Sequence, residues 1–170
     1  ISYFTSVNNN KIAQIYADSD NKLNVRMCGI NECLSKLPSK GDQPSACEGF
    51  CCVEIPNFAL ESAKNDSKSS SRASSRSKSL TSNFLFPKYS PSIAIFGGKS
   101  ELNSIKSELY TYSVATNIWK KISLISAEIN SRVGHRAIAI NKDEHTFIYV
   151  FGGTNGYFLE DNLLLICLCG

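Results

Sequence analysis

The chain has 170 residues, of which 42% are hydrophobic, and its formal net charge is only +3. This composition allows a packed core, but a small net positive charge gives no reason to expect nucleic acid or an anionic membrane as a partner. No apolar run reaches 18 residues, so we expect no membrane span in this segment, although a longer protein that contains it can have one.

Residues 1–27 are predicted to form β-strands. Lys11–Tyr16 and Leu23–Met27 each alternate between apolar and polar residues, and a polar turn at Asp18–Asn21 separates them. Two alternating runs around such a turn predict a hairpin with one buried face. Asp18 and Asp20 carry carboxylates of the kind that bind calcium, but two carboxylates on one hairpin are too few to predict a calcium site.

Residues 28–60 contain most of the cysteines, show no clear periodicity and are expected to be irregular. The clustered cysteines are Cys28, Cys33, Cys47, Cys51 and Cys52. Clustering of this kind predicts either a disulfide framework or a metal site. Cys167 and Cys169 lie apart from the cluster in a strand pattern, where we expect buried thiols.

Residues 61–83 are rich in serine, lysine and arginine, and we interpret them as a linker or a degenerate lead-in to the repeats that follow. The tract is too short to predict RNA binding, and no RNA-binding module accompanies it. Asn65 begins an Asn-Asp-Ser acceptor pattern and is a candidate for N-glycosylation.

Residues 84–170 are predicted to be β throughout, because short apolar runs recur between turn residues without a helical stripe. Ile93–Gly98 and Ile148–Gly153 are both apolar runs that end in two glycines. Upstream of them, Ser71–Arg76 and Ser131–Arg136 also resemble each other. A self-similar unit of about fifty residues is typical of a β-propeller blade.

The repeated residues suit the structural demands of such a blade. Two glycines permit close backbone approach and positive φ, and the apolar run before the first pair predicts a strand buried on both faces. Tyr110, Tyr112 and Trp119 are large enough to fill the gap between adjacent blades.

Together these features resemble the kelch repeat, with its Arg-x-Gly-His lead-in, its strand ending in two glycines, its Leu-Tyr-x-Tyr strand and its Thr-Asn-x-Trp turn. The first copy is degenerate, because Ser75 stands where the histidine is expected. The residues that carry the resemblance are Gly97, Gly98, Tyr110, Tyr112, Trp119, Arg132, Gly134, His135, Gly152 and Gly153.

The order of segments resembles the attractin and multiple-EGF-like-domain family, in which a CUB domain, EGF-like modules and a kelch propeller follow one another. The resemblance implies an all-β fold with the end of a CUB-like sandwich at 1–27, a degenerate EGF-like module at 28–60, the linker at 61–83 and about two kelch blades at 84–170. It also implies disulfides rather than zinc among the clustered cysteines. The chain is then expected to be a fragment of a longer protein.

We expect no enzymatic activity, cofactor or metal, because no nucleophile motif or phosphate loop occurs and His135 has no catalytic partner in the sequence pattern. The sequence also lacks the set of tyrosine and histidine ligands with which a propeller-type oxidase binds copper. The resemblance implies an extracellular or cell-surface module that binds a protein ligand or receptor through blade loops such as Lys99–Ser107 and Thr154–Asp161. The alternative is a cytoplasmic kelch adaptor that presents a partner to a ubiquitin ligase or the cytoskeleton.

Overall fold

A computed structural model describes residues 2–7, 11–29, 39–55, 92–125, 129–142 and 145–168. The described part contains eleven strands and no helix, which confirms the predicted all-β class. The strands are β1 (Ser2–Val7), β2 (Lys11–Ala17), β3 (Leu23–Gly29), β4 (Lys40–Gly41), β5 (Cys51–Ile55), β6 (Ser92–Phe96), β7 (Leu109–Ser113), β8 (Ile118–Ile122), β9 (Arg136–Lys142), β10 (His145–Phe151) and β11 (Leu163–Leu168). Within these residues no helix is long and apolar enough to cross a membrane.

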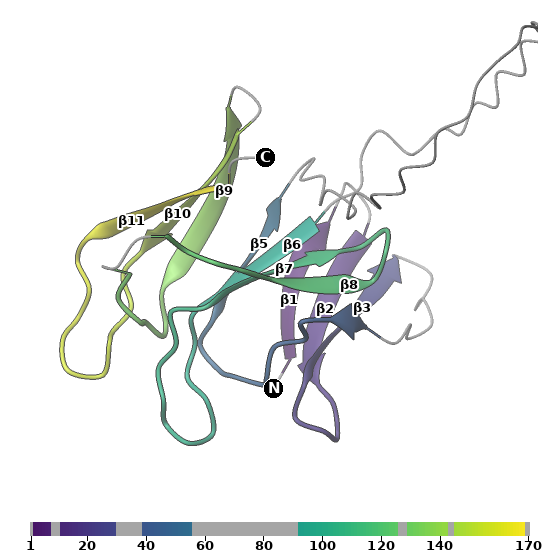
Figure 1. Cartoon of the computed structure of the whole chain (residues 1–170), viewed down its shortest axis with the longest axis horizontal. Coiled ribbons are helices and arrows are strands. Elements are labelled where there is room, and N and C mark those ends of the chain that lie inside the picture. The colour runs from purple at the N-terminus through teal and green to yellow at the C-terminus, as the bar shows by residue number, and fades with distance from the viewer. Residues whose placement is uncertain are drawn as a thin grey trace, which may run out of the picture.

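The strands form three sheets, which Figure 1 shows side by side. The first sheet has the order β1-β2-β3, the middle sheet β4-β8-β7-β6-β5, and the third sheet β11-β10-β9. All pairings are antiparallel except the short pairing of β4 with β8. Each sheet therefore contains a meander of three consecutive strands that begins at one edge.

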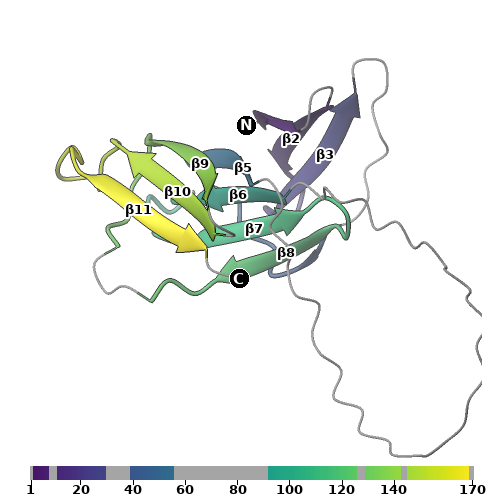
Figure 2. The same ribbon diagram turned by 90° about the horizontal axis from the view of Figure 1, so that it is seen from above.

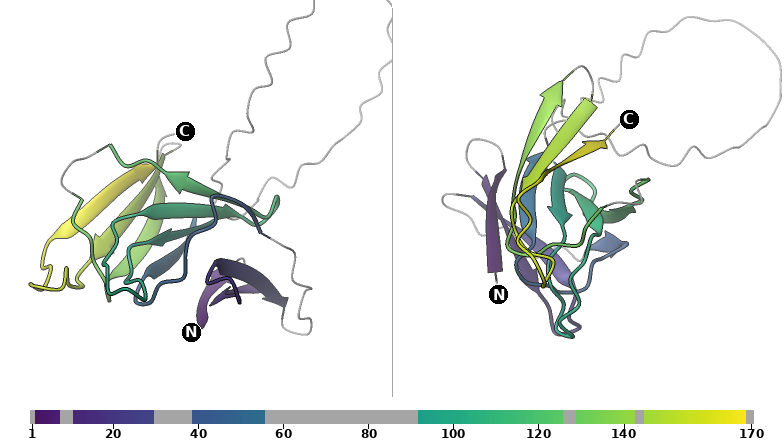
Figure 3. Two further views of the ribbon diagram at one scale, coloured as in Figure 1. Left: turned by 60° about the horizontal axis from the view of Figure 1, so that its bottom comes forward. Right: turned by 90° about the vertical axis from the view of Figure 1, so that its left-hand side faces the viewer.

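The sheets approach one another along those first strands. β5 contacts β1 on one side and β9 on the other, and all three are edge strands of their sheets. The remaining strands lie farther apart, so the sheets spread like a fan (Figure 3). This geometry leaves a wedge between neighbouring sheets, and large side chains fill it.

In the middle sheet, β6 is buried on both faces. All five residues of β6 are buried, with Ile93 and Ile95 packed toward the first sheet and Ala94 and Phe96 toward the third. Adjacent residues of a strand point to opposite faces, so a strand covered on both sides buries consecutive residues rather than alternate ones. The prediction of two-sided burial for this apolar run is confirmed.

Aromatic side chains fill the wedge between the first and middle sheets. Tyr112 and Trp119 are both buried, with ring centroids 4.9 Å apart, and they pack against Ala13 and Ile15 of the first sheet. Tyr110 is partly buried at the margin of the same cluster. The three aromatic residues thus lie between two sheets, as the sequence predicted.

The third sheet has only one covered face. Ile148 and Val150 of β10 are buried against the middle sheet, whereas Ile138, Phe151 and Leu163 are each 59% exposed on the other face. Cys167, expected to be a buried thiol, is exposed on this face as well. No further sheet covers this face within the described residues.

The predicted hairpin in the first sheet is confirmed as β2 and β3, paired with Ile15 opposite Val25. Asp18 shapes the turn between them. Its Oδ1 accepts hydrogen bonds from the backbone N–H groups of Asp20 and Lys22 at 3.0 and 2.9 Å. The carboxylate of Asp18 therefore acts as a local turn acceptor.

The prediction of an irregular segment at 28–60 is wrong for Cys51–Ile55. These residues form β5, which pairs with β6 so that Cys51 lies opposite Phe96. β9 and β10 pair in the same register, with Arg136 opposite Phe151. Cys51 and Cys52 are adjacent on this strand, the first buried and the second partly buried, and each packs as a small apolar residue. Segment 61–83, Ser71–Arg76 and Asn65 lie outside the described residues.

Candidate functional site

The two double glycines lie where β6 and β10 end, and all four residues have positive φ. The values are 68° and 98° for Gly97 and Gly98, and 72° and 87° for Gly152 and Gly153. Residues with a side chain rarely adopt this left-handed region. Each pair therefore allows its strand to turn sharply into the loop that follows it.

Gly97 and Gly98 also meet the backbone of the next unit. The N–H of Gly98 donates a hydrogen bond to the carbonyl of Arg132 at 2.9 Å. A Cβ on Gly97 would lie 2.6 Å from that carbonyl oxygen and 2.7 Å from Cε1 of His135. We call this contact between Gly97–Gly98 and Arg132–His135 the glycine junction.

The residue that follows each glycine pair makes the same two backbone hydrogen bonds to the segment that leads into its own sheet. Glu48 and Lys99 exchange two backbone hydrogen bonds of 2.9 and 2.8 Å, and Val133 and Thr154 exchange two of 3.0 Å. By this register, Gly49 takes the place of Gly134 in the earlier unit. The lead-in of the middle sheet is therefore Glu48–Cys51, rather than the Ser71–Arg76 segment expected from the sequence.

His135 is buried in the glycine junction with 1% of its surface exposed. Its Nε2 lies 3.1 Å from the carbonyl oxygen of Phe96, and its ring meets the Phe96 ring edge-on at 5.4 Å. Burial, with smaller effects from Arg132 and Arg136, lowers the pKa of His135 to about 4. A neutral ring whose Nε2–H donates to Phe96 fits this environment, so His135 ties β6 to the third sheet.

The buried side chain of Arg132 binds residues of the loop that follows β10. Its side chain is buried, and its guanidinium donates to Asn162 Oδ1 at 3.0 Å and lies 3.6 Å from a carboxylate oxygen of Glu160. It also lies 3.4 Å from the carbonyl oxygen of Gly152. The sequence pointed to Arg132 but not to Glu160 or Asn162, whose partner is distant in the chain.

The loop held by Arg132 presents three apolar side chains to solvent. Tyr157, Phe158 and Leu159 are 88%, 74% and 85% exposed. The Oδ1 of Asn155 accepts hydrogen bonds from the N–H groups of Tyr157 and Phe158, both at 2.9 Å. Thr154 closes the loop by donating its hydroxyl to the carbonyl of Phe158 at 2.7 Å. Side-chain hydrogen bonds thus fix the loop that displays these residues.

The loop after β6 lies beside it at the same end of the sheets (Figure 1). A Cβ on Gly156 would lie 3.1 Å from Cδ1 of Ile105, so the two loops touch. Leu102 at the tip of the earlier loop is 91% exposed. We call the exposed residues Leu102, Tyr157, Phe158 and Leu159 the loop surface.

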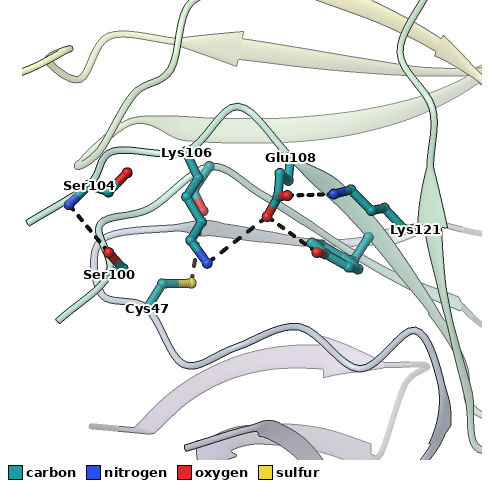
Figure 4. Close-up of polar contacts among 8 residues, drawn as sticks. Cys47, Ser100, Ser104, Lys106, Glu108 and Lys121 are labelled. Atoms are coloured by element: carbon teal, nitrogen blue, oxygen red, sulfur yellow. Dashed lines mark hydrogen bonds and ion pairs between the residues drawn. The ribbon is translucent and has the colours of Figure 1, made fainter. Parts of the chain in front are cut away.

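A charged cluster lies at the start of β7 (Figure 4). The Glu108 carboxylate binds the ammonium group of Lys121, accepts the Tyr110 hydroxyl at 3.2 Å and lies 4.0 Å from Nζ of Lys106. Burial alone raises the pKa of Glu108, but Lys121, Lys106 and Tyr110 together hold it below its usual value. The cluster is satisfied internally and stabilises the ends of β7 and β8.

Three of the five cysteines predicted to form disulfides, Cys47, Cys51 and Cys52, are free thiols. Burial raises the pKa of Cys47 to about 11 and those of Cys51 and Cys52 to about 12. At neutral pH these thiols are protonated and poor nucleophiles. Cys28 lies on β3, and Cys33 lies outside the described residues.

The predicted motif residues therefore separate into two places. The glycines, Arg132 and His135 gather around the glycine junction, while Tyr110, Tyr112 and Trp119 lie between the first and middle sheets. Among the described residues, no group of three or more histidine, cysteine or acidic side chains is arranged to hold a metal ion. No family model and no curated protein matches the chain.

Substituting Gly97 tests the close approach at the junction. Gly97→Ala is expected to lower the free energy of unfolding by at least about 2 kcal/mol more than Gly152→Ala. Both residues have positive φ, but a Cβ on Gly152 would meet no atom within 4 Å. Urea denaturation of both variants measures the difference, and equal losses would show that the junction is not tightly packed.

The buried His135 is expected to make stability depend on pH. Its pKa is lower in the folded chain than the usual 6.5, so the unfolded chain takes up the proton first. The stabilisation is complete above pH 6.5 and is lost as the pH falls toward 4, by up to about 3 kcal/mol.

Denaturation from pH 4 to 8 measures this dependence. His135→Gln is expected to remove this part of the slope, and His145→Gln, at an exposed histidine, is the control that keeps it. An unchanged slope in His135→Gln would contradict the assignment.

Proposed function

We propose that the chain is part of a kelch-type β-propeller that binds another protein through the loop surface, without catalysis. Three features support a propeller: sheets that fan out from their first strands, a repeated register of hydrogen bonds, and double glycines at the strand ends. Radial stacking of four-stranded antiparallel sheets is the defining geometry of that fold.

On this proposal the first sheet is also a blade, in place of the CUB-like tail expected from the sequence. Its strands follow the order β1-β2-β3, as the neighbouring sheets follow β5-β6-β7 and β9-β10-β11. β1 contacts β5 as β5 contacts β9. The shared arrangement supports three consecutive blades rather than two blades behind a separate domain.

The exposed Tyr157, Phe158 and Leu159 carry the proposal of protein binding. Exposed aromatic residues are frequent anchors of protein interfaces. The hydrogen bonds of Asn155 and the buried contacts of Arg132 hold this loop before any partner arrives. A fixed loop loses little conformational entropy on binding, so the apolar side chains retain more of their binding energy.

A photo-crosslinking amino acid at position 158 tests this function. We expect it to crosslink a defined protein partner, with the yield reduced at least about tenfold by Tyr157→Ala in the same chain. The control places the same amino acid at Lys11, an exposed polar position on the first sheet. Equal crosslinking from both positions, or none from position 158, would contradict binding through the loop surface.

Two cellular locations are compatible with this proposal, and different residues support each of them. The resemblance to attractin and the Asn65 acceptor pattern support an extracellular module. The free thiols of Cys47, Cys51 and Cys52 instead favour the second candidate, a cytoplasmic kelch adaptor, because thiols persist in a reducing compartment.

Alkylation of the denatured, unreduced chain, read by mass spectrometry, discriminates between these locations. The adaptor predicts that Cys47, Cys51 and Cys52 are all labelled. The extracellular module predicts that they react only after reduction.

A further inference from the structure

The loop that follows β10 contains Asn155 and Gly156, the only Asn-Gly pair in the 170-residue sequence. The backbone nitrogen that follows an asparagine can attack its side-chain amide and release ammonia. Glycine hinders this attack least, because it has no Cβ. In Figures 1 and 2 the loop lies at the margin of the molecule, and Gly156 is exposed. Water can therefore reach the pair.

Two backbone donors polarise the side-chain amide of Asn155. Its Oδ1 accepts hydrogen bonds from the N–H groups of Tyr157 and Phe158, both at 2.9 Å. Negative charge develops on this oxygen when a nucleophile adds to Cγ. Donors that already point at such an oxygen act as an oxyanion hole, and the loss of one such donor slows an enzyme about 10²–10³-fold. The folded loop therefore favours attack on the amide of Asn155.

The attacking nitrogen has an acceptor beside its proton. The N–H of Gly156 donates to Oγ1 of Thr154 at 3.0 Å, and the Thr154 hydroxyl donates to the carbonyl of Phe158 at 2.7 Å. Hydrogen bonds in such a chain polarise one another. An acceptor on this N–H increases the electron density of the nitrogen, which makes it a better nucleophile.

The leaving nitrogen is also held by the folded chain. Nδ2 of Asn155 donates to Oε1 of Glu160 at 3.0 Å, and the Glu160 carboxylate lies 3.6 Å from the buried guanidinium of Arg132. These contacts fix the plane of the amide relative to the backbone of the loop. Each polar atom of the reacting pair thus has a partner that an unfolded chain does not supply.

We propose that the folded loop promotes deamidation of Asn155, so that Asn155 and Gly156 form a self-modification site. The nitrogen of Gly156 gives its proton to hydroxide and forms a bond to Cγ of Asn155. The bond from Cγ to Nδ2 breaks, and this nitrogen takes a proton from water and leaves as ammonia. Water then opens the cyclic imide to aspartate or isoaspartate. The sum consumes one water and releases one ammonia, with no change of oxidation state.

Conversion changes the support of the loop surface. A carboxylate oxygen replaces the Nδ2 donor beside Glu160, so two like charges face each other where a hydrogen bond was. Isoaspartate also lengthens the backbone, which shifts Oδ1 away from the N–H groups of Tyr157 and Phe158. We expect a less ordered loop. An effect on partner binding rests on the function proposed for the loop surface, whereas the conversion itself does not.

Incubation of the folded 170-residue chain near neutral pH tests the proposal. Peptide mass spectrometry measures the change of the Asn155 amide to a carboxyl group, and fragmentation distinguishes aspartate from isoaspartate. Conversion is expected to be at least about tenfold faster in the folded chain than in a synthetic peptide of residues 152–160, because the fold holds the oxyanion donors in place. Asn103, which precedes serine in the neighbouring exposed loop, is the internal control and is expected to remain asparagine.

Two threonine variants test the role of the acceptor. Thr154→Val keeps the side-chain shape but removes the oxygen that accepts the Gly156 N–H, and it is expected to slow conversion at least about tenfold. Thr116→Val, in the exposed turn between β7 and β8, is the matched control and is expected to leave the rate unchanged. Circular dichroism checks that both variants remain folded.

Chymotrypsin measures the order of the converted loop, because it cleaves after exposed aromatic residues such as Tyr157 and Phe158. Asn155→Asp carries the charge of the converted residue and is expected to be cleaved there at least about threefold faster than the unaltered chain. Equal cleavage of the two chains would contradict the expected loss of order.

Conversion in the folded chain at or below the rate of the peptide would overturn the proposal, because the hydrogen bonds of the loop would then protect the amide. Unchanged or faster conversion in Thr154→Val would overturn it as well. The mass readout needs no partner, so a failure to crosslink from position 158 would contradict the proposed function and leave this result intact.

Discussion

The close approach of two backbones at the glycine junction determines how the sheets stack. Gly97 lies where a Cβ would come within 2.6 Å of the Arg132 carbonyl oxygen, and Gly98 donates to that same oxygen. The Nε2 of His135 adds a hydrogen bond to the backbone carbonyl of Phe96, the last residue of β6. Because these contacts join the end of β6 to the start of the third sheet, they fix the distance and register between the two sheets.

Burial of the sheet faces follows from that spacing. Phe96 and Ala94 are covered because the third sheet lies against them, whereas their counterparts Phe151 and Tyr149 lie on the open face of that sheet. Fully burying a side chain such as Phe96 contributes about 1.5–3 kcal/mol, so the middle sheet gains stability on both faces and the third sheet on one. The outer face of the third sheet is exposed because no further sheet lies against it within the described residues.

The glycine junction also positions the loops. Arg132 contributes its backbone to the junction and its side chain to Asn162 and Glu160. The packing of the sheets and the order of the loop after β10 therefore depend on one residue. The support of the loop surface therefore lies in the core of the molecule.

Local patterns in the sequence predicted much of this arrangement. The double glycines, the aromatic residues of β7 and β8 and the β2–β3 hairpin follow from periodicity and turn chemistry. β5 was missed because residues 56–91 separate it from its partner β6 and because its cysteines were interpreted as disulfide formers. Glu160 and Asn162 carry no local signal, since their role depends on a buried arginine in a distant segment.

The pairing of β5 with β6 is the most direct test of the repeated unit, because it defines the middle sheet as a counterpart of the third. Nuclear magnetic resonance of the whole chain measures it through cross-strand proton contacts. We expect contacts between Cys51–Ile55 and Ser92–Phe96 in the register that places Val53 opposite Ala94. Contacts from Ser92–Phe96 to Ser71–Arg76 instead would contradict the repeat and the stacking derived from it.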